Sequence, residues 1–551
     1  MQGIEVTMAG PDDVRPEPGG YAARIMASLA ADPDRVAVHW RGRAVRAGDF
    51  ADSVAGIVRT LQDLGAGPGS MVGILVAPNA PDMLGVRYAA NLLGAAVCHL
   101  GTTNPGSAKR ALPIDAQLRI LLDTSADVLF ADAENAERAR DLIDLMPGPL
   151  TLIGFDVDVP GAVPIAPGSA PDLADVLPCA TGNLAMVAFT SGSTGRPKGI
   201  RLTARHLDSS LSAQLTSMIE PAPARLLATT PLSHSVAPMA DAVLAAGGTV
   251  FLQEDFGPAE MLRAVAEHRI TRTFMATSHL YQLLDHSGSR TADLSSLRLL
   301  VYTGSAAAPA RLKDAVEVFG PRLIQAYGTT EGGRITHLDP WEHEDPRLVC
   351  SVGRPFPEVE LKVCDPDSGA EVEAGAIGEV WYRSPLVMEG YWADLELTAR
   401  VLRDGWYRTG DIGRLDEDGY LYLRDRVADV VKTHGVKVYP VEVERQILAL
   451  PGISHAAVYG VRDADGQEHL HAAVVPRFDA QIDPAAIRAE ISTALSPLHA
   501  PEEILLLDEL PLNAAGKPDK PRLRSWAPPR RDTGTGAPWR PGADRHPSES
   551  E

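Results

Sequence analysis

Short apolar runs alternate with helical stretches over residues 36–300, and this alternation constrains the fold more than any other feature of the chain. Such a pattern is typical of parallel strands joined by helices that cover the faces of the sheet. The sequence therefore predicts an α/β fold whose large N-terminal domain holds two helix-covered, mostly parallel sheets. The apolar runs are Met71–Ala77, Val128–Ala131, Thr151–Phe155, Leu226–Thr229, Thr249–Leu252 and Arg298–Tyr302, and the helical stretches are Asp49–Leu64, Pro81–Leu93, Glu134–Leu145, Ala204–Met218 and Pro258–Glu267.

The rest of the chain divides into a β-rich segment and a smaller domain. Residues 350–423 carry strand-like runs separated by Asp- and Gly-containing turns, which predicts a small β-rich subdomain at the end of a domain of residues 1–423. Residues 430–525 have strand and helix signals of their own, so we expect a small, mobile α+β C-terminal domain beyond a hinge at residues 424–429. The tail, residues 526–551, is rich in Pro, Arg, Ser and Gly and is expected to be disordered.

Composition excludes several functional classes. A chain of 551 residues is too long for one core, and its net charge of −21 argues against a nucleic-acid-binding surface. Neither a signal peptide at the N-terminus nor an apolar run long enough to span a membrane is present, so we expect a cytoplasmic enzyme. The cysteines are far apart and form no C-x-x-C pair, which favours reduced thiols over a zinc site or a disulfide framework; they are Cys98, Cys179, Cys350 and Cys364.

A loop rich in glycine and hydroxyl side chains follows the apolar run Leu184–Phe189. Glycine lets the backbone N–H groups approach phosphate oxygens closely, and nearby cations offset the negative charge. Lys198 is followed by another strand-like run rather than by a helix, so the segment predicts a mobile hairpin over a polyphosphate and not a P-loop. The residues expected to bind phosphate are Thr190, Ser191, Gly192, Ser193, Thr194, Gly195 and Lys198.

Further clusters follow this loop, and each is ambiguous alone. Taken together, in this order, they resemble the acyl-adenylate-forming superfamily, which includes acyl-CoA synthetases, firefly luciferases and the adenylation domains of peptide synthetases. The resemblance extends from about residue 36 to residue 524 and is strongest to bacterial fatty-acyl or aryl CoA ligases, judging by Pro231–His234 and Gly390–Trp392. The clusters are Tyr327–Glu331, Tyr407–Asp411, Asp425-Arg426, Gly435–Pro440 and Pro511–Lys517.

The resemblance implies a nucleotide site. The loop would hold the β- and γ-phosphates of ATP, and Thr330 would contact the α-phosphate. Glu331 would help to hold Mg²⁺, whose preferred ligands are carboxylate and phosphate oxygens. Asp411 and Arg426 would bind the ribose. The remaining nucleotide contacts implied are Gly304, Ser305 and Ala306 along adenine, Tyr327 on or beside it, Gly328 and Thr329.

The resemblance also implies the catalytic groups. Lys517 would stabilise negative charge as a carboxylate attacks the α-phosphorus, and Thr194 and Glu331 would assist. His234 would line the acyl pocket, although a histidine near apolar residues is also typical of a core. Small and polar side chains in the expected pocket favour a short, polar or aromatic acid, although its glycines equally fit a role in backbone geometry alone. The pocket residues are His234, Ser235, Ser278, Gly304, Gly328 and Gly332.

The expected reaction has two halves, adenylation of the acid and transfer to a second nucleophile. The family resemblance implies that the C-terminal domain rotates between them and brings Lys437 toward the site. Ala428 stands where the family usually has Asp or Lys at the hinge, and Lys432, His434 and Lys437 form an unusually cationic strip. The favoured nucleophile is coenzyme A. The alternatives are a carrier-protein phosphopantetheine or an amine, including activation of an unusual acid such as nitrite in secondary metabolism, and a non-catalytic nucleotide-binding scaffold.

Overall fold

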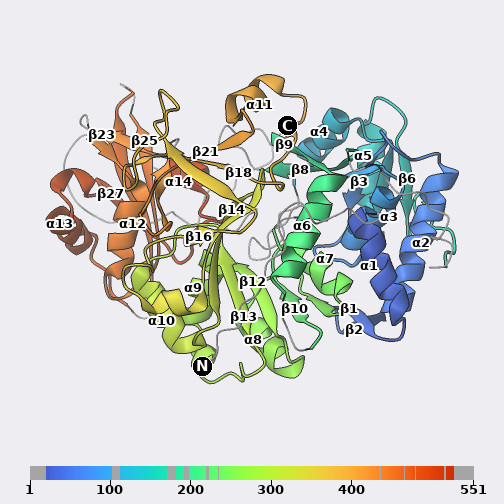
Figure 1. Cartoon of the computed structure of the whole chain (residues 1–551), viewed down its shortest axis with the longest axis horizontal. Helices are drawn as coiled ribbons and strands as arrows, with labels where there is room; N and C mark the ends of the chain where they lie inside the picture. Colours follow the sequence, from blue (N-terminus) through green and yellow to red (C-terminus); the bar gives the residue numbers. More distant parts are fainter. Residues whose placement is uncertain are drawn as a thin grey trace, which may run out of the picture.

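The protein, seen as a computed structural model, contains two large sheets separated by helices (Figure 1). The structure describes residues 20–101, 112–169, 180, 182–190, 198–218, 222–233, 235–427, 429–433, 436–463, 466–477, 480–513 and 517–526. The first sheet runs in the order β16 (Arg354–Pro355), β15 (Gly333–Leu338), β14 (Leu323–Thr329), β13 (Leu299–Thr303), β12 (Arg272–Ala276), β10 (Arg225–Ala228), β11 (Thr249–Leu252), β1 (Val36–Trp40) and β2 (Arg43–Arg46). The second runs β19 (Gly390–Tyr391), β9 (Lys198–Thr203), β8 (Leu184–Thr190), β4 (Ala96–His99), β3 (Met71–Leu75), β5 (Val128–Ala131), β6 (Thr151–Gly154) and β7 (Val163–Pro164).

Alternate residues of each strand are buried on opposite faces of these sheets. In β10, Leu226 and Ala228 belong to the core between the sheets, whereas Leu227 belongs to the core on the outer face. This period of two is what a strand covered on both faces requires. The helices of the central layer are α1 (Gly20–Ala31), α2 (Ala47–Asp63), α3 (Asp82–Leu92), α6 (Ala204–Thr216) and α7 (Ala237–Ala245).

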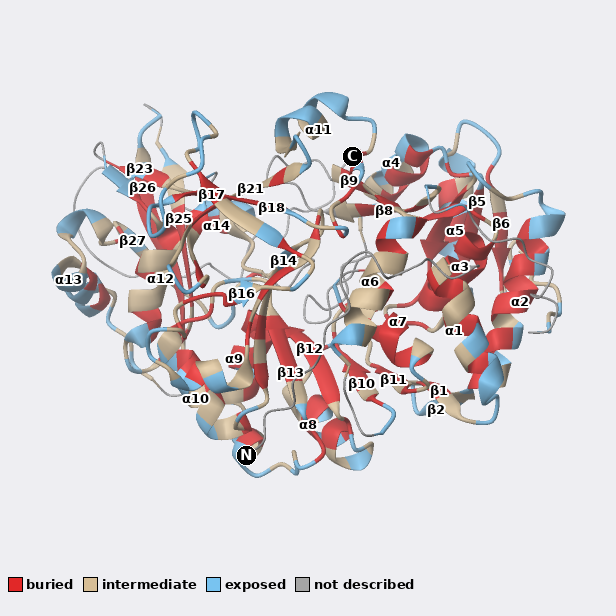
Figure 2. Ribbon diagram, in the orientation of Figure 1, coloured by how far each residue is buried: buried red, intermediate tan, exposed pale blue. Residues whose placement is uncertain are grey.

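The outer faces of both sheets are covered as well. Helices α4 (Ile114–Thr124) and α5 (Ala136–Leu145) cover the second sheet, and α8 (Pro258–Glu267), α9 (Thr277–Asp285) and α10 (Pro309–Phe319) cover the first. The strands are accordingly buried along much of their length, with exposed residues gathered at helix faces and turns (Figure 2). The predicted α/β fold with helix-covered, mostly parallel sheets is confirmed.

A smaller, largely antiparallel sheet follows. It consists of β17 (Glu360–Cys364), β18 (Gly378–Arg383), β21 (Trp406–Leu415) and β20 (Leu402–Arg403), with β22 (Leu421–Arg426) paired to β21. The helix α11 (Leu395–Val401) precedes β20. These strands lie in the segment predicted to be β-rich, except that β22 continues to Arg426, within the residues predicted to form the hinge.

The last part of the chain forms its own small α+β module. Its sheet is β25 (Ile453–Arg462), β26 (Glu468–Pro476) and β27 (Glu503–Leu506), with a separate hairpin β23 (Val431–Thr433) and β24 (Val436–Val438). Helices α12 (Pro440–Ala449) and α13 (Pro484–Ala494) supply core residues, and α14 (Lys520–Trp526) packs on β25. This C-terminal module lies against α9 and α10 (Figure 1).

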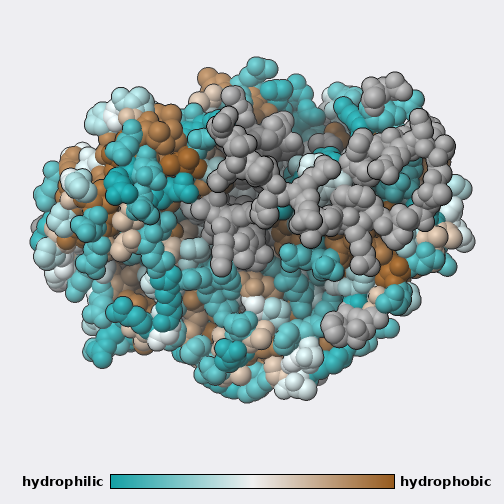
Figure 3. Space-filling model, turned by 180° about the vertical axis from the view of Figure 1, so that it is seen from behind, coloured by the Kyte–Doolittle hydropathy of each residue, from teal (hydrophilic) through white to brown (hydrophobic). Residues whose placement is uncertain are grey.

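The surface fits the composition. Seen from behind, the described surface is mostly hydrophilic, with hydrophobic residues in smaller patches (Figure 3). Among the described residues, no helix combines the length and the apolar character needed to cross a membrane. Cys98, Cys350 and Cys364 are free thiols, as expected, while Cys179 lies outside the described residues.

Candidate active site

The predicted phosphate loop joins two antiparallel strands. Strands β8 and β9 are consecutive in the chain and pair antiparallel, from Leu184 with Thr203 to Thr190 with Lys198, as the two arms of a hairpin do. The expectation of a hairpin in place of a strand-to-helix turn is confirmed. Residues 191–197, which include Ser191, Gly192, Ser193, Thr194 and Gly195, lie outside the described residues.

Two parallel strands of the first sheet bring the expected adenine-binding segments to one edge. Strands β13 and β14 are parallel neighbours, and parallel strands end at the same edge of a sheet. Gly304 follows β13, and Tyr327 lies near the end of β14. Thr277, at the start of α9, holds the first of these segments, because its hydroxyl donates to the carbonyls of Thr303 at 3.1 Å and Ser305 at 2.9 Å.

Lys517 comes from the C-terminal module and lies over Gly304. Its Cε is 3.6 Å from the point where a Cβ on Gly304 would stand, and Gly304 has a φ of +102°. Backbone bonds hold the lysine, since Asn513 N donates to the Lys517 carbonyl at 2.8 Å and Lys517 N donates to Asn513 Oδ1 at 3.2 Å. A Cβ on Gly304 would make only an ordinary contact with the aliphatic part of Lys517, so the positive φ, and not a lack of space, is what favours glycine there.

Burial, followed by the neighbouring charges, shifts the pKa of Lys517. Burial, reinforced by the neighbouring cation Arg426, lowers the pKa of Lys517 to about 8, while Asp411 and Glu331 oppose this shift. A lysine with this pKa is mostly charged at neutral pH and loses its charge as the pH rises through about 8. Perturbation by burial together with named charges is typical of a functional group.

Asp411 is buried and accepts two side-chain hydrogen bonds. Tyr327 donates its hydroxyl to Oδ2 at 2.5 Å, and Arg426 Nε donates to Oδ1 at 3.0 Å. The proximity of Asp411 raises the pKa of Arg426, and burial followed by Asp411 raises the pKa of Tyr327 well above its usual value. The predicted adenine residue, ribose carboxylate and linker arginine therefore form one cluster.

Glu331 lies in the turn between β14 and β15, beside a tyrosine from β19. Tyr391 donates its hydroxyl to Glu331 Oε1 at 3.0 Å, and Lys198 Nζ lies 5.6 Å from the centre of the Tyr391 ring. Tyr391 thus links the cation at the end of the hairpin to the carboxylate expected to hold Mg²⁺. Among the residues that the structure describes, no three His, Cys, Asp or Glu side chains gather as a metal site. A single carboxylate fits Mg²⁺, which proteins commonly bind together with substrate phosphates.

Glycines in this turn make room for neighbouring atoms. A Cβ on Gly332 would stand 1.4 Å from the hydroxyl oxygen of Tyr382, and one on Gly328 would stand 2.3 Å from the Gly333 carbonyl oxygen. Thr329 Oγ1 also lies 3.1 Å from the Tyr382 hydroxyl. Close packing against the Tyr382 side chain accounts for Gly332, and packing against the backbone accounts for Gly328, so their role in an acyl pocket stays a prediction.

The other predicted site residues are more scattered. Ser278 is buried at the start of α9, Ser235 is exposed before α7, and Ser305 is exposed beyond β13. Ala306 and Thr330 are half-buried. Lys437 is exposed on the β23–β24 hairpin, where it is the cross-strand partner of Lys432. His234 and Ala428 lie outside the described residues.

Comparison with known proteins identifies the family. The AMP-binding enzyme model matches residues 26–392, and the model of the AMP-binding enzyme C-terminal domain matches residues 442–517. The chain belongs to the AMP-binding enzyme family. The expected relationship to acyl-adenylate-forming enzymes and the prediction of an AMP-forming ligase are both confirmed.

Relatives of this AMP-binding enzyme cover most of its length. It is 34% identical to a medium/long-chain fatty-acid CoA ligase of Mycobacterium tuberculosis over 87% of this chain and 85% of the relative. It is 32% identical to a feruloyl-CoA synthase of Amycolatopsis sp over 89% of this chain and 96% of the relative. Among solved structures, amide bond synthetase McbA from Marinactinospora thermotolerans is 35% identical, with a TM-score of 0.79, over 92% of this chain and 99% of that chain.

Sequence reasoning did not give site roles to several residues of this AMP-binding enzyme. Tyr391 belongs to the segment Gly390–Trp392 that resembles the family, but the sequence does not predict its contact with Glu331. Tyr382 and Thr277 carry no local signal, because a tyrosine in a strand and a threonine at a helix start are common anywhere. Their positions beside Thr329 and the Gly304 segment appear once the strands are assembled.

Polar contacts hold the C-terminal module in its present orientation. Ser454 donates to Asp285 Oδ2 at 2.5 Å, and Arg477 Nη2 lies 3.1 Å from Asp314 Oδ2. His455 Nε2 lies 3.4 Å from the carbonyl oxygen of Ser278. These contacts to α9 and α10 come from the same module that carries Lys517.

Proposed function

We propose that this enzyme uses ATP to adenylate a small carboxylic acid and then transfers the acyl group to the thiol of coenzyme A. The observation that carries the first half is the placement of Lys517 over Gly304, within the electrostatic reach of Asp411 and Glu331. A lysine from the far end of the chain thus reaches the edge of the sheet where adenine and ribose are expected to bind. In this proposal the acid oxygen attacks the α-phosphorus, and pyrophosphate leaves.

The charges in the cluster match this chemistry. Lys517 would face the triphosphate, where a cation stabilises the charge that develops in phosphoryl transfer, and Arg426 would contact the ribose. Asp411 would exchange its present hydrogen bonds for the ribose hydroxyls. Glu331 would hold Mg²⁺, which when bound would neutralise phosphate charge. Thr194 and His234 keep their predicted roles in phosphate binding and the acyl pocket.

The second half needs a different arrangement of the C-terminal module. Lys432 and Lys437 are cross-strand partners on β23 and β24, and both are exposed. Such a pair of cations suits the phosphates of coenzyme A. In the proposal, rotation about residues 424–429 withdraws Lys517 and turns this hairpin toward the acyl-adenylate.

The acid is proposed to be aryl or short and polar. The relative named a feruloyl-CoA synthase supports an aryl acid. The relative named a medium/long-chain fatty-acid CoA ligase supports a longer alkyl acid instead. An amine acceptor is the second candidate, favoured by the 35% identity to an amide bond synthetase over nearly all of that chain. A carrier protein remains a third acceptor to be tested.

A panel of acids tests this function and separates the acceptors. Pyrophosphate release should depend on one class of acid, with aryl acids exceeding long alkyl acids by about tenfold, a difference of roughly 1.4 kcal/mol in transition-state binding. The acyl-adenylate, once formed, should give a thioester with coenzyme A. An amide formed with an added aryl amine, and no thioester with coenzyme A, would replace the main proposal with the second. If none of the acids supports pyrophosphate release, both the main proposal and the second one are contradicted.

The pH dependence of the reaction should reflect the protonation state of Lys517. Its pKa is lowered to about 8, so the charged form is lost as pH rises through that value. We expect kcat/KM for ATP, which reflects the free enzyme, to fall above about pH 8. In Lys517→Arg the side chain stays charged, so this fall should disappear even if the maximal rate is lower. A falling limb that is unchanged in Lys517→Arg would assign the titration to another group.

A further inference from the structure

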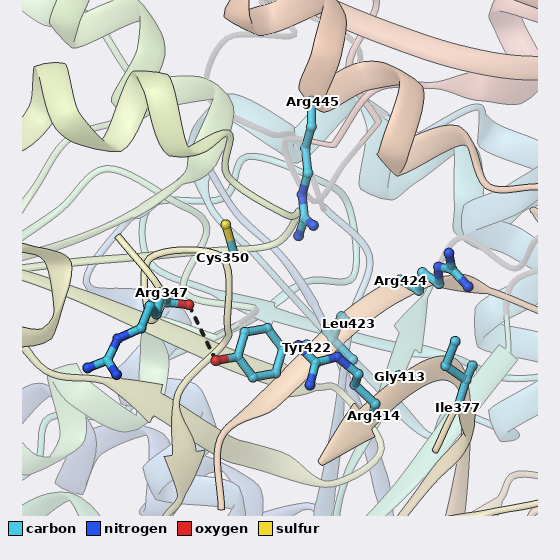
Figure 4. Close-up of a pocket in the computed structure, with 9 residues that line it drawn as sticks. All are labelled: Arg347, Cys350, Ile377, Gly413, Arg414, Tyr422, Leu423, Arg424 and Arg445. Carbon is cyan, nitrogen blue, oxygen red and sulfur yellow. Dashed lines mark hydrogen bonds between the residues drawn. The ribbon is translucent and has the colours of Figure 1, made fainter. Parts of the chain in front are cut away.

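A cavity of about 530 Å³ lies beside strands β21 and β22, where α12 of the C-terminal module approaches them (Figure 4). Its wall contains four arginines, Arg347, Arg414, Arg424 and Arg445, together with Cys350 and Tyr422. This set of residues differs from the cluster around Lys517. The volume lies in the range of small-molecule sites.

The arginines are incompletely neutralised. Arg347 pairs with Asp345 at 2.7 Å, and Arg424 lies 3.8 Å from Glu442. Within the described part of the chain, neither Arg414 nor Arg445 has an ion-pair partner; Arg414 instead stacks on Tyr422 with its Cζ 4.1 Å from the ring centre. No carboxylate lines the cavity among the described residues.

Arg445 gives the clearest sign of a missing partner. Its Nε is buried and has no hydrogen-bond partner among the described residues. Figure 4 shows its side chain descending from α12 with the guanidinium directed into the cavity, opposite Tyr422 and the arginines of the β-rich sheet. The donors that an anion in the cavity would meet are the terminal nitrogens of this guanidinium, because Nε itself is buried away from solvent.

We propose that this cavity binds a compact oligophosphate, meaning a small molecule with two or more linked phosphoryl groups. Guanidinium groups present planar forks of donors that match phosphate oxygens, and several arginines around one cavity suit several phosphoryl groups. The chain as a whole carries a net charge of −21, so an arginine-lined cavity without acidic lining is a local exception to the charge of the molecule.

The site spans the two sides of the expected hinge. Arg445 belongs to α12, whereas Arg347, Arg414 and Arg424 precede residues 424–429 or stand at their start. A ligand held by both groups favours the arrangement in which they face each other, by as much as its affinity differs between arrangements. This inference rests on the proposed function. It predicts that the bound oligophosphate holds the C-terminal module in the arrangement for adenylation and slows transfer of the acyl group to coenzyme A.

Calorimetry with sodium tripolyphosphate tests the site. We compare the full-length protein, Arg414→Gln/Arg445→Gln and the control Arg43→Gln/Arg298→Gln, which removes the same charge at exposed positions outside the cavity. The cavity variant should bind at least about tenfold more weakly than the other two, as expected for loss of two charge-assisted contacts. Equal binding by all three proteins, or no binding by the unmodified protein, would overturn the proposal. Citrate binding as tight as tripolyphosphate binding would overturn the phosphate class.

Two further measurements keep the result interpretable. If Arg414→Gln/Arg445→Gln does not fold, Arg414→Gln alone should still weaken binding several-fold, because Arg414 stacks at the cavity wall. At fixed free Mg²⁺, tripolyphosphate should slow thioester formation from preformed acyl-adenylate in the unmodified and control proteins but not in the cavity variant. Binding without this difference would overturn the effect on the hinge. Calorimetry remains valid if no acid is adenylated, so failure of the site and failure of the proposed function are distinguishable.

Discussion

Lys517→Ala is expected to lower acid-dependent pyrophosphate release by about 10²–10³-fold, the effect of removing one group that stabilises transition-state charge. We expect this effect because the Lys517 side chain lies over Gly304 and interacts with the charges of Arg426, Asp411 and Glu331. Alanine keeps the backbone bonds to Asn513 but removes the cation. The measurement is single-turnover pyrophosphate release at saturating ATP and acid, which separates chemistry from product release.

Two control measurements show whether the loss of rate is specific to Lys517 and to the adenylation step. Lys313→Ala, an exposed lysine on α10, should retain the full rate. Transfer from preformed acyl-adenylate to coenzyme A should be nearly unchanged in Lys517→Ala, because the proposed second arrangement withdraws this lysine. Retention of more than about a tenth of the pyrophosphate rate would remove Lys517 from the catalytic role.

Asp241→Ala is expected to reduce the free energy of unfolding by about 3–5 kcal/mol, the cost of leaving a buried charge without its partner. Arg87 of α3 forms two hydrogen bonds to Asp241 of α7, at 2.9 and 2.6 Å, and the arginine side chain is only 3% exposed. Tyr88 also donates to Asp241 at 2.5 Å. The network joins two helices of the central layer, and α7 follows the segment that contains His234.

Urea denaturation followed by circular dichroism measures this change through the transition midpoint. Asp144→Ala, at an exposed position on α5, should change stability by no more than about 0.5 kcal/mol. Replacing both partners, as Arg87→Met/Asp241→Leu, should be less harmful than Asp241→Ala, since no unpaired charge remains. Equal midpoints for Asp241→Ala and Asp144→Ala would contradict the prediction.

The sequence predicted the strands and helices with the clearest periodicity. The run Thr249–Leu252 matches β11, and the stretch Pro258–Glu267 matches α8. It did not identify α9 or α10, although both are regular helices that support the C-terminal module. Both helices are short, and the formation of a short helix depends on the surfaces that pack against it.

The candidate site was predicted as a set of residues but not as an arrangement. The order of the motifs in the sequence predicted Asp411, Arg426 and Tyr327 as nucleotide contacts, and the structure brings these three into hydrogen-bonded contact. That Gly332 is required by Tyr382 could not be anticipated, because the two lie on different sheets of the fold.

The sequence by itself determined the alternation of strands and helices, the hairpin between β8 and β9, and the family to which the chain belongs. The tertiary structure alone decided that Lys517 lies over Gly304 and that Arg445 completes a cavity of arginines. The physical reason is that periodicity acts between residues close in the chain, whereas these contacts join segments that are far apart in the sequence and meet only when the whole chain is packed.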